Sequence, residues 1–255
     1  MSPMDPHDLY DSTLKGALGC RAVWPPVLTP TLLGDYGVVD GGVFRRLGNV
    51  AEFATPFTTT RGQPSRLDLS TSDVRLTRFA GGVQVPSLAG LGDVSARVRI
   101  EFGRSDGFVL KCARVELEEI ADLGVLARRL LAARAPDGQR WRPLAWRLVW
   151  QRYTGHDVFF FAARSAGSHV ELDGSATLLH GIDAAAGSAG LSRHRAAGLG
   201  LEIVGDSGPI GLGLARVKLV GGVKFFSDDP DSASDDEFVE RLPPGADAAP
   251  DADEP

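Results

Sequence analysis

The strongest constraint on the fold is a run of strictly alternating residues at positions 94–102, VSARVRIEF. Its apolar residues would share one face of a strand, and two arginines and a glutamate would share the other. An antiparallel sheet with one face in water produces this pattern. Shorter strand-like segments, broken by glycine and proline, precede it from residue 65 onward. The sequence therefore predicts an α+β fold, a single domain with a twisted, mainly antiparallel sheet flanked by helices.

Two helices are expected around this sheet. Residues 6–18, PHDLYDSTLKGAL, place leucines near helical spacing and stop before Gly19. Residues 117–135, LEEIADLGVLARRLLAARA, place leucines and Ile120 on one face of a second helix. This second run begins with Glu118 and Glu119 and ends with arginine, charges that suit the helix dipole.

Several turns are predicted from glycine-rich and polar pairs. Asp40-Gly41-Gly42 predicts a β-hairpin, and residues 105–107, SDG, predict a second hairpin that joins the 94–102 strand to FVLKCARVEL. Residues 145–174 predict two or three strands with turns at Thr154-Gly155 and at 165–167. Two last strands, GLGLEIVG and IGLGLARVKLVG, would be joined by a turn at GDSGP, and residues 176–198 would form a helix or a loop.

The charge is divided unevenly along the chain. The whole sequence has 27 basic and 33 acidic residues, but eleven acids and a single base lie from Ser227 onward, so 26 bases and 22 acids precede it. Residues 1–226 therefore form a body of about +4, and residues 227–255 form an acidic, disordered tail of about −10. Such a body is attracted to anionic surfaces, and the tail competes for its charge. The alternative is a tail that is only a solvated extension.

No pattern predicts an enzyme active site, a metal site or a cofactor. GDSGP resembles a serine-protease nucleophile motif, but no earlier histidine segment accompanies it, and a turn explains the same residues. The five histidines lack metal-ligand spacing. No concentrated Lys/Arg run predicts nucleic-acid binding, although arginines beside aromatic residues at 146–153 keep that option open.

Two further features bear on the compartment. No apolar run approaches the roughly 18 residues of a membrane helix, and the first 20 residues lack a signal-peptide pattern, which favours the cytoplasm. The cysteines, Cys20 and Cys112, are too few for a disulfide framework or a zinc site. Cys112 lies in an apolar alternation and is expected in the core.

Four segments follow one another along the chain: LYDSTLKGALGCRAVWPP, LTPTLL, the FRRLGNV turn and the closing strand PIGLGLARVKL. In this order of elements the chain resembles the bacterial gasdermins, a family of pore-forming executioners of cell death. The resemblance implies a twisted antiparallel sheet with helices, and a short C-terminal segment that restrains pore formation until a protease removes it. The family carries a lipid-modified cysteine very near its N-terminus, where this chain has none.

The resemblance also implies roles for particular residues. Cys20 is the candidate for acylation, against the alternative of an ordinary buried cysteine. Candidate positions for activating cleavage are Ser227, Asp228, Asp229, Arg241 and Leu242, and candidate inhibitory contacts are Phe238, Val239 and Leu242. The alternating segments around 67–102 and 145–172 would lengthen into membrane hairpins, the second with Trp146, Leu148, Trp150, Phe159, Phe160 and Phe161.

The leading hypothesis is therefore a cytoplasmic pore-forming effector, restrained by its C-terminal segment and activated by a partner protease. It would bind anionic lipids, oligomerise into a β-barrel pore in the inner membrane and serve antiphage defence. One alternative is a non-enzymatic binding or scaffold protein whose acidic tail aids solubility. Another is a hydrolase, which would rest on GDSGP alone.

Overall fold

Two antiparallel sheets and two α-helices make up the part of the chain that the computed structural model describes, residues 6–135, 138, 140–142, 145–176, 179, 192–217 and 223–225. Sheet A has nine strands (β1–β5, β9, β10, β13 and β14), and sheet B has five (β6, β7, β8, β11 and β12). The expectation of mainly antiparallel strands with two helices is confirmed, and the single expected sheet is replaced by two.

The elements follow the chain in a simple order. Their bounds are α1 Pro6–Leu18, β1 Arg21–Ala22, β2 Asp35–Asp40, β3 Val43–Asn49, the 3-10 helix η1 Val50–Phe53, β4 Thr59–Arg61, β5 Ser65–Ser70, β6 Val74–Ala80, β7 Val83–Val85, β8 Ser95–Phe102, β9 Phe108–Ile120, α2 Leu123–Ala132, β10 Arg147–Ala163, β11 His169–Ser175, β12 Ser192–Ala197, β13 Leu199–Val217 and β14 Val223–Phe225.

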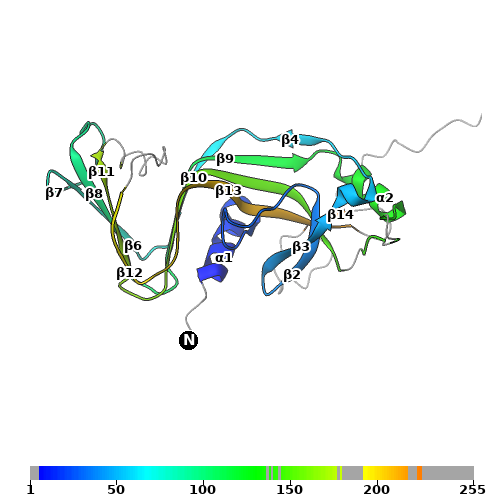
Figure 1. Ribbon diagram of the computed structural model, residues 1–255, viewed down its shortest axis with the longest axis horizontal. Coiled ribbons are helices and arrows are strands. Elements are labelled where there is room, and N and C mark those ends of the chain that lie inside the picture. The colour runs from blue at the N-terminus through cyan, green and yellow to red at the C-terminus, as the bar shows by residue number, and fades with distance from the viewer. Residues whose placement is uncertain are drawn as a thin grey trace, which may run out of the picture.

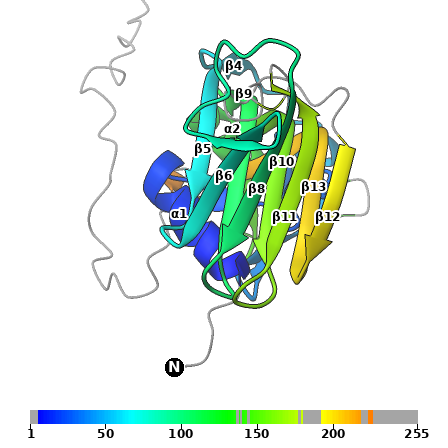
Figure 2. The ribbon, with the colours of Figure 1, turned by 90° about the vertical axis from the view of Figure 1, so that its left-hand side faces the viewer.

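Three long strands, β9, β10 and β13, form the middle of sheet A and extend over most of the molecule (Figure 1). Sheet B lies at one end of the molecule, where the chain turns back on itself. Its strands β6, β8, β11 and β12 run side by side there (Figure 2). Helix α1 lies against one side of the long strands, and α2 lies at the end of sheet A remote from sheet B.

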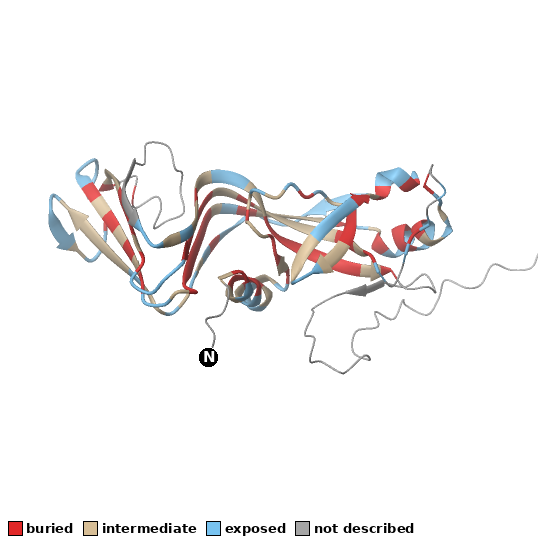
Figure 3. Ribbon diagram, turned by 60° about the horizontal axis from the view of Figure 1, so that its bottom comes forward, coloured by how far each residue is buried: buried red, intermediate tan, exposed pale blue. Residues whose placement is uncertain are grey.

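Each packing layer has its own apolar core. One core lies between sheet A and α1 and includes Tyr10, Phe108 and Phe160. A second lies under α2, and a third fills the space between the sheets, where β8 and β11 meet residues such as Phe159 and Phe161 of β10. The long strands are therefore buried on both faces over part of their length, as Figure 3 shows.

The alternation at 94–102 is confirmed in β8. Ala96, Val98, Ile100 and Phe102 are buried, and the arginines between them are half-buried. The helix predicted at 6–18 and the hairpin around Asp40-Gly41-Gly42 are also confirmed, as α1 and the β2–β3 pair.

The second helix begins later than the sequence predicts. Residues 117–120 continue β9, and α2 starts at Leu123. Glu118 and Glu119 therefore do not occupy a helix N-terminus. They pair across strands instead, with Arg61 and Arg152 contacting Glu118 and with Gln151 donating to Glu119 at 2.9 Å. Tertiary pairing outweighs the helical pattern of these residues.

One predicted hairpin and two predicted turns are wrong. Residues 105–107 do not make a hairpin, because β8 belongs to sheet B and the following β9 belongs to sheet A. Thr154-Gly155 lies inside β10, and GDSGP lies inside β13. Both are bends in continuous strands, with positive φ angles of 49° at Asp157 and 78° at Gly205. A bulge admits turn-type residues without ending the strand.

The predicted turn at 165–167 is confirmed between β10 and β11. Of the segment predicted as a helix or loop, residues 192–197 form β12, and most of the remainder lies outside the described residues.

Candidate functional site

The functional candidate is a pair of long hairpins that are folded back on themselves. Strand β5 pairs with β9 in sheet A and continues after three residues as β6, which pairs with β8 in sheet B. Strand β8 leads into β9, so residues 65–120 form one antiparallel hairpin bent across its middle. Residues 147–217 form a second bent hairpin, because β10 pairs with β13 in sheet A and β11 pairs with β12 in sheet B. We call these the first and the second folded hairpin.

The two folded hairpins contact each other along their central strands in one unbroken register. Phe108 faces Ala162 in sheet A, and seven residues further along each strand, in opposite chain directions, Glu101 faces His169 in sheet B. Backbone hydrogen bonds reach into the fold itself, from Phe102 to Ser168 at 2.9 Å and from Ala163 to Gly107 at 2.8 Å. The central pair therefore keeps the same partners through the bend.

The outer pairs are less regular. In the first folded hairpin, Ser70 faces Val109 in sheet A and Val74 faces Phe102 in sheet B, which shifts the register by three residues. Turn and bend residues lie at this level of the molecule, at 71–73, 103–107, 164–168 and Gly198, whose φ is 73°. Glycine and serine accept such bends at low cost.

Side chains on sheet B separate cleanly by face. The face turned away from the core carries a ladder of ion pairs in which Arg97 contacts Asp173 at 2.7 Å and Glu171 at 3.5 Å, and Arg99 contacts Glu101 at 2.8 Å. A shallow cavity lies over this ladder beside Phe79. The opposite face holds the apolar residues of the core between the sheets.

Helix α1 covers the other face of the long strands. The Tyr10 ring lies 5.2 Å from Phe160 and 5.5 Å from Phe108, and its hydroxyl donates to the Ile210 carbonyl at 3.0 Å. Burial raises the pKa of Tyr10 well above its ordinary value. The buried Asp11, in the middle of α1, ties the helix to β1, because it accepts from the Ala22 amide at 2.8 Å and pairs with Arg21 at 3.0 Å.

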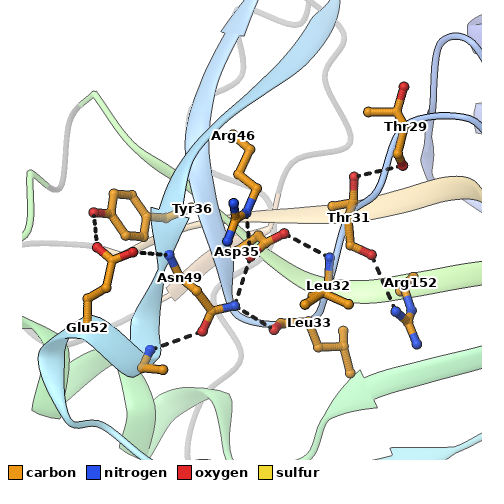
Figure 4. Close-up of polar contacts among 11 residues, drawn as sticks. Thr29, Thr31, Leu32, Leu33, Asp35, Tyr36, Arg46, Asn49, Glu52 and Arg152 are labelled. Carbon is orange, nitrogen blue, oxygen red and sulfur yellow. Dashed lines mark hydrogen bonds and ion pairs between the residues drawn. The ribbon is translucent and has the colours of Figure 1, made fainter.

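A polar network ties the segment 29–33 to the β2–β3 hairpin (Figure 4). Asp35 is fully buried, and its carboxylate accepts from the Leu32 amide at 2.8 Å, the Asn49 side chain at 2.8 Å and Arg46 at 2.9 Å. Asn49 also caps η1, and Arg152 of β10 donates to the Thr31 carbonyl at 3.3 Å. These contacts hold the start of the sheet against β10, and they are structural rather than catalytic.

The six aromatic and apolar residues predicted for a membrane hairpin all lie on or beside β10. Trp146 and Leu148 are buried under α2, and Trp150 is partly buried. Phe160 points to the α1 side, and Phe159 and Phe161 point toward sheet B. The structure therefore brings these residues to one strand but distributes them over three cores.

Both cysteines are core residues. This was expected for Cys112, and for Cys20 it matches the alternative of an ordinary buried cysteine. Cys20 is 2% exposed and Cys112 is fully buried, and burial raises the pKa of each thiol to about 12. Acylation of Cys20 would require this region to open first. The predicted cleavage and inhibitory residues, from Ser227 to Leu242, lie outside the described residues.

Ser207 of the GDSGP segment is exposed, and its hydroxyl accepts a 3.4 Å hydrogen bond from the Asp157 backbone amide. His156, in the neighbouring bulge, instead lies with its Nε2 3.4 Å from a carboxylate oxygen of Glu116. Within the described ranges, no three His, Cys, Asp or Glu side chains are grouped to hold a metal ion. No helix in that part of the chain has the length and apolarity to cross a membrane.

Comparison with known proteins gives matches at the level of structure. No family model and no curated protein matches the sequence. The structure is similar to a bacterial gasdermin from Bradyrhizobium tropiciagri, with 12% identity and a TM-score of 0.35, over 85% of this chain and 90% of that one. It is also similar to the gasdermin A3 membrane pore, with 11% identity and a TM-score of 0.33, over 90% of this chain and 97% of that one. At these TM-scores the similarity assigns no activity and no site residue.

The folded hairpins were missed by sequence reasoning because their bends contain ordinary turn residues. The sequence SDG at 105–107 reads as a hairpin turn, although the strands on either side belong to different sheets. One signal of a continuous strand was present in the sequence. Phe102 and Phe108 are both even-numbered, so the apolar residues before and after the break follow the same alternation.

We predict that Asp35→Ala lowers the free energy of unfolding by about 2–3 kcal/mol, because the fully buried carboxylate and its bonds to the Leu32 amide, the Asn49 side chain and Arg46 are lost. Urea unfolding measures this change. The matched control is Asp40→Ala, which removes an exposed ion pair with Arg45 at 3.0 Å and should cost less than about 1 kcal/mol. Equal costs for the two variants would contradict the structural role of the network.

Proposed function

We propose that this protein is a gasdermin-like pore former whose acidic C-terminal segment keeps it inactive until a protease removes that segment. The pore would arise when the two folded hairpins straighten and insert into a membrane as long antiparallel strands. Our proposal extends to assembly of several copies into a β-barrel in an anionic inner membrane, and to a role in cell death during antiphage defence. In the inactive state the protein would remain in the cytoplasm.

The observation that carries the proposal is the unbroken register of the central pair. If the bend opens, β8 and β9 become one strand over residues 95–120, and β10 and β11 become another over 147–175, with no exchange of partners. Each straight strand would be roughly 90 Å long at about 3.3 Å per residue. A tilted strand of about 9–11 residues already crosses a bilayer, so the length is ample.

Straightening would also bring the apolar residues of the two halves onto one face, which Arg104, Asp106 and Arg164 interrupt at the bend. In an extended strand, even-numbered residues share a face and odd-numbered residues share the other. The even face would carry Ala96, Val98, Ile100, Phe102, Phe108, Leu110, Val158, Phe160, Ala162, Val170 and Leu172. In the folded state these residues belong to two separate cores, one under α1 and one between the sheets.

The odd face would carry the charged ladder of sheet B. Arg97, Arg99 and Glu101 lie on one strand, and Glu171 and Asp173 lie on its partner. In the sheet B half this division matches a membrane barrel, which turns apolar residues toward lipid and polar residues toward a water-filled interior. In the sheet A half, Val109, Phe159 and Phe161 also lie on the odd face. All backbone groups of the central pair would stay hydrogen-bonded, which the bilayer requires.

Two parts of the folded protein would oppose this opening. Helix α1 covers Phe108 and Phe160 through Tyr10, and the sheets cover each other's apolar faces. The acidic tail adds an electrostatic restraint, since its net charge of about −10 repels anionic lipid and competes for the basic body. Removal of the tail would shift the balance toward the membrane.

The first test is dye release from liposomes. A recognition sequence for a sequence-specific protease is inserted after Phe226 of the full chain, and the protein is cleaved in the presence of anionic or neutral vesicles. We expect rapid release only after cleavage and mainly from anionic vesicles, because the body then carries about +4 without its tail. The control is the uncut protein with a catalytically inactive protease. A cleaved monomer that releases no dye would favour a binding or scaffold protein.

A second test separates the two faces of the first folded hairpin. An environment-sensitive dye is attached to Leu76→Cys or, as the matched neighbour, to Arg75→Cys, both on β6. Leu76 belongs to the apolar face and Arg75 to the exposed polar face. On cleavage with liposomes, the Leu76 dye should shift its emission to the blue and the Arg75 dye should not. Equal shifts at both positions would contradict the assignment of faces.

A further inference from the structure

Helix α2 has an exposed face, where Arg129 donates to the Pro56 carbonyl at 3.2 Å. Its buried side consists of Leu123, Leu126, Ala127 and Leu130, while Val125, Arg128 and Arg129 on the opposite side are exposed. Val125 is 36% exposed. This face therefore combines an apolar side chain with two positive charges.

More arginines surround the end of this helix. Arg134 and Arg140 face each other across an antiparallel bridge, and Arg142 is exposed two residues later. Like charges directly opposite each other on a ladder are unfavourable unless an anion screens them. We name Arg128, Arg129, Arg134, Arg140 and Arg142 the α2 arginine surface.

The charges of this surface lack acidic partners among the described residues. None of its five arginines forms an ion pair with a described carboxylate, whereas Arg46, Arg61, Arg97, Arg99 and Arg152 elsewhere all do. Asp137, which lies outside the described residues, is the only acid between residues 123 and 150, against six arginines in the same stretch. The local excess of positive charge is therefore about as large as that of the whole body.

The acidic tail begins next to this surface. Strand β14 pairs with Ala215, Arg216 and Val217 of β13 and packs against α2 (Figure 1). Seven acids follow within 228–240, and Phe238 and Val239 lie among them. Ten extended residues reach at most roughly 35 Å. Helix α2, with ten residues, is only about 15 Å long. The first acids can therefore reach along the whole length of the helix.

We propose that residues 228–240 bind the α2 arginine surface in the uncut protein. The aspartates and glutamates pair with the exposed arginines, and Phe238 or Val239 covers Val125. Three observations support this segment as the binding partner. Its charge is opposite to that of the surface, it follows β14 directly in the chain, and no described carboxylate pairs with the five arginines. The binding itself is independent of pore formation, but its role as the restraint rests on the function proposed above.

Cross-linking in the full chain tests the contact. The double variant Ala132→Cys/Ala233→Cys places one thiol at the exposed end of α2 and one in the tail, and Ala89→Cys/Ala233→Cys is the control with its first thiol on the exposed segment before β8. Both native thiols are buried, with pKa values of about 12, so they exchange slowly at neutral pH. We expect the first pair to form an intramolecular disulfide about tenfold faster than the second in about 0.1 M salt, and the advantage to disappear in about 1 M salt.

Matched charge variants test the surface in the same assay. Arg128→Gln/Arg134→Gln should abolish the faster cross-linking, and Arg66→Gln/Arg75→Gln, two exposed arginines on β5 and β6, should leave it unchanged. In the dye-release assay, the uncut Arg128→Gln/Arg134→Gln variant should leak without cleavage.

The outcomes separate the two proposals. Equal cross-linking rates for both thiol pairs would overturn the contact, whatever the leakage assay shows. Fast cross-linking together with no leakage after cleavage would leave the contact in place and overturn the pore-forming function. Binding of the uncut protein to anionic vesicles that depends on Arg128 and Arg134, without fast cross-linking, would assign the surface to lipid and overturn the proposal.

Discussion

The structure depends on the antiparallel pairing between β8–β9 and β10–β11, which passes through the fold without a change of register. The other strands are added to this pair, which contacts β2, β4, β5 and β13 directly in sheet A and β6 and β12 in sheet B. Because the side-chain period of a strand is two, an unbroken register also preserves which residues share a face. The folded protein therefore already contains the pairing of a longer, straight sheet, and the bend together with helix α1 hides its apolar residues.

The bend is held by packing and not by the pairing itself. Tyr10 of α1 contacts Phe108 and Phe160 on one side of the long strands, and the core between the sheets joins Phe159 to Ile100 on the other. Burial of such side chains stabilises the folded form by roughly 1.5–3 kcal/mol each. A membrane would provide an equivalent apolar environment for the same residues. The equilibrium between the two forms is then set by smaller contributions, among which surface charge is the most adjustable.

Much of the local structure could be predicted from the sequence, because it follows from periodicity and turn chemistry. The alternation at 94–102, helix α1 and the hairpin at Asp40 were predicted correctly on these grounds. The start of α2 and the GDSGP bend were not, since Glu118 pairs with Arg152 across strands and Gly205 bends a strand without ending it. The fold-back was also missed, because strand pairing between residues as far apart along the chain as Ser95 and Ser175 leaves no local signal. The sequence analysis detected the charge of the α2 arginine surface only as part of the net positive charge of residues 1–226.

The central claim is that the hairpins straighten, and a distance across the bend tests it most directly. Donor and acceptor dyes on Ser95→Cys/Ala121→Cys mark the two ends of the β8–β9 strand, at exposed positions. After cleavage in the presence of anionic liposomes, we predict that energy transfer falls toward the value for roughly 85 Å, the length of a straight strand of this size. Cleavage without liposomes should leave it unchanged. Dye release from the vesicles with unchanged energy transfer would contradict the account.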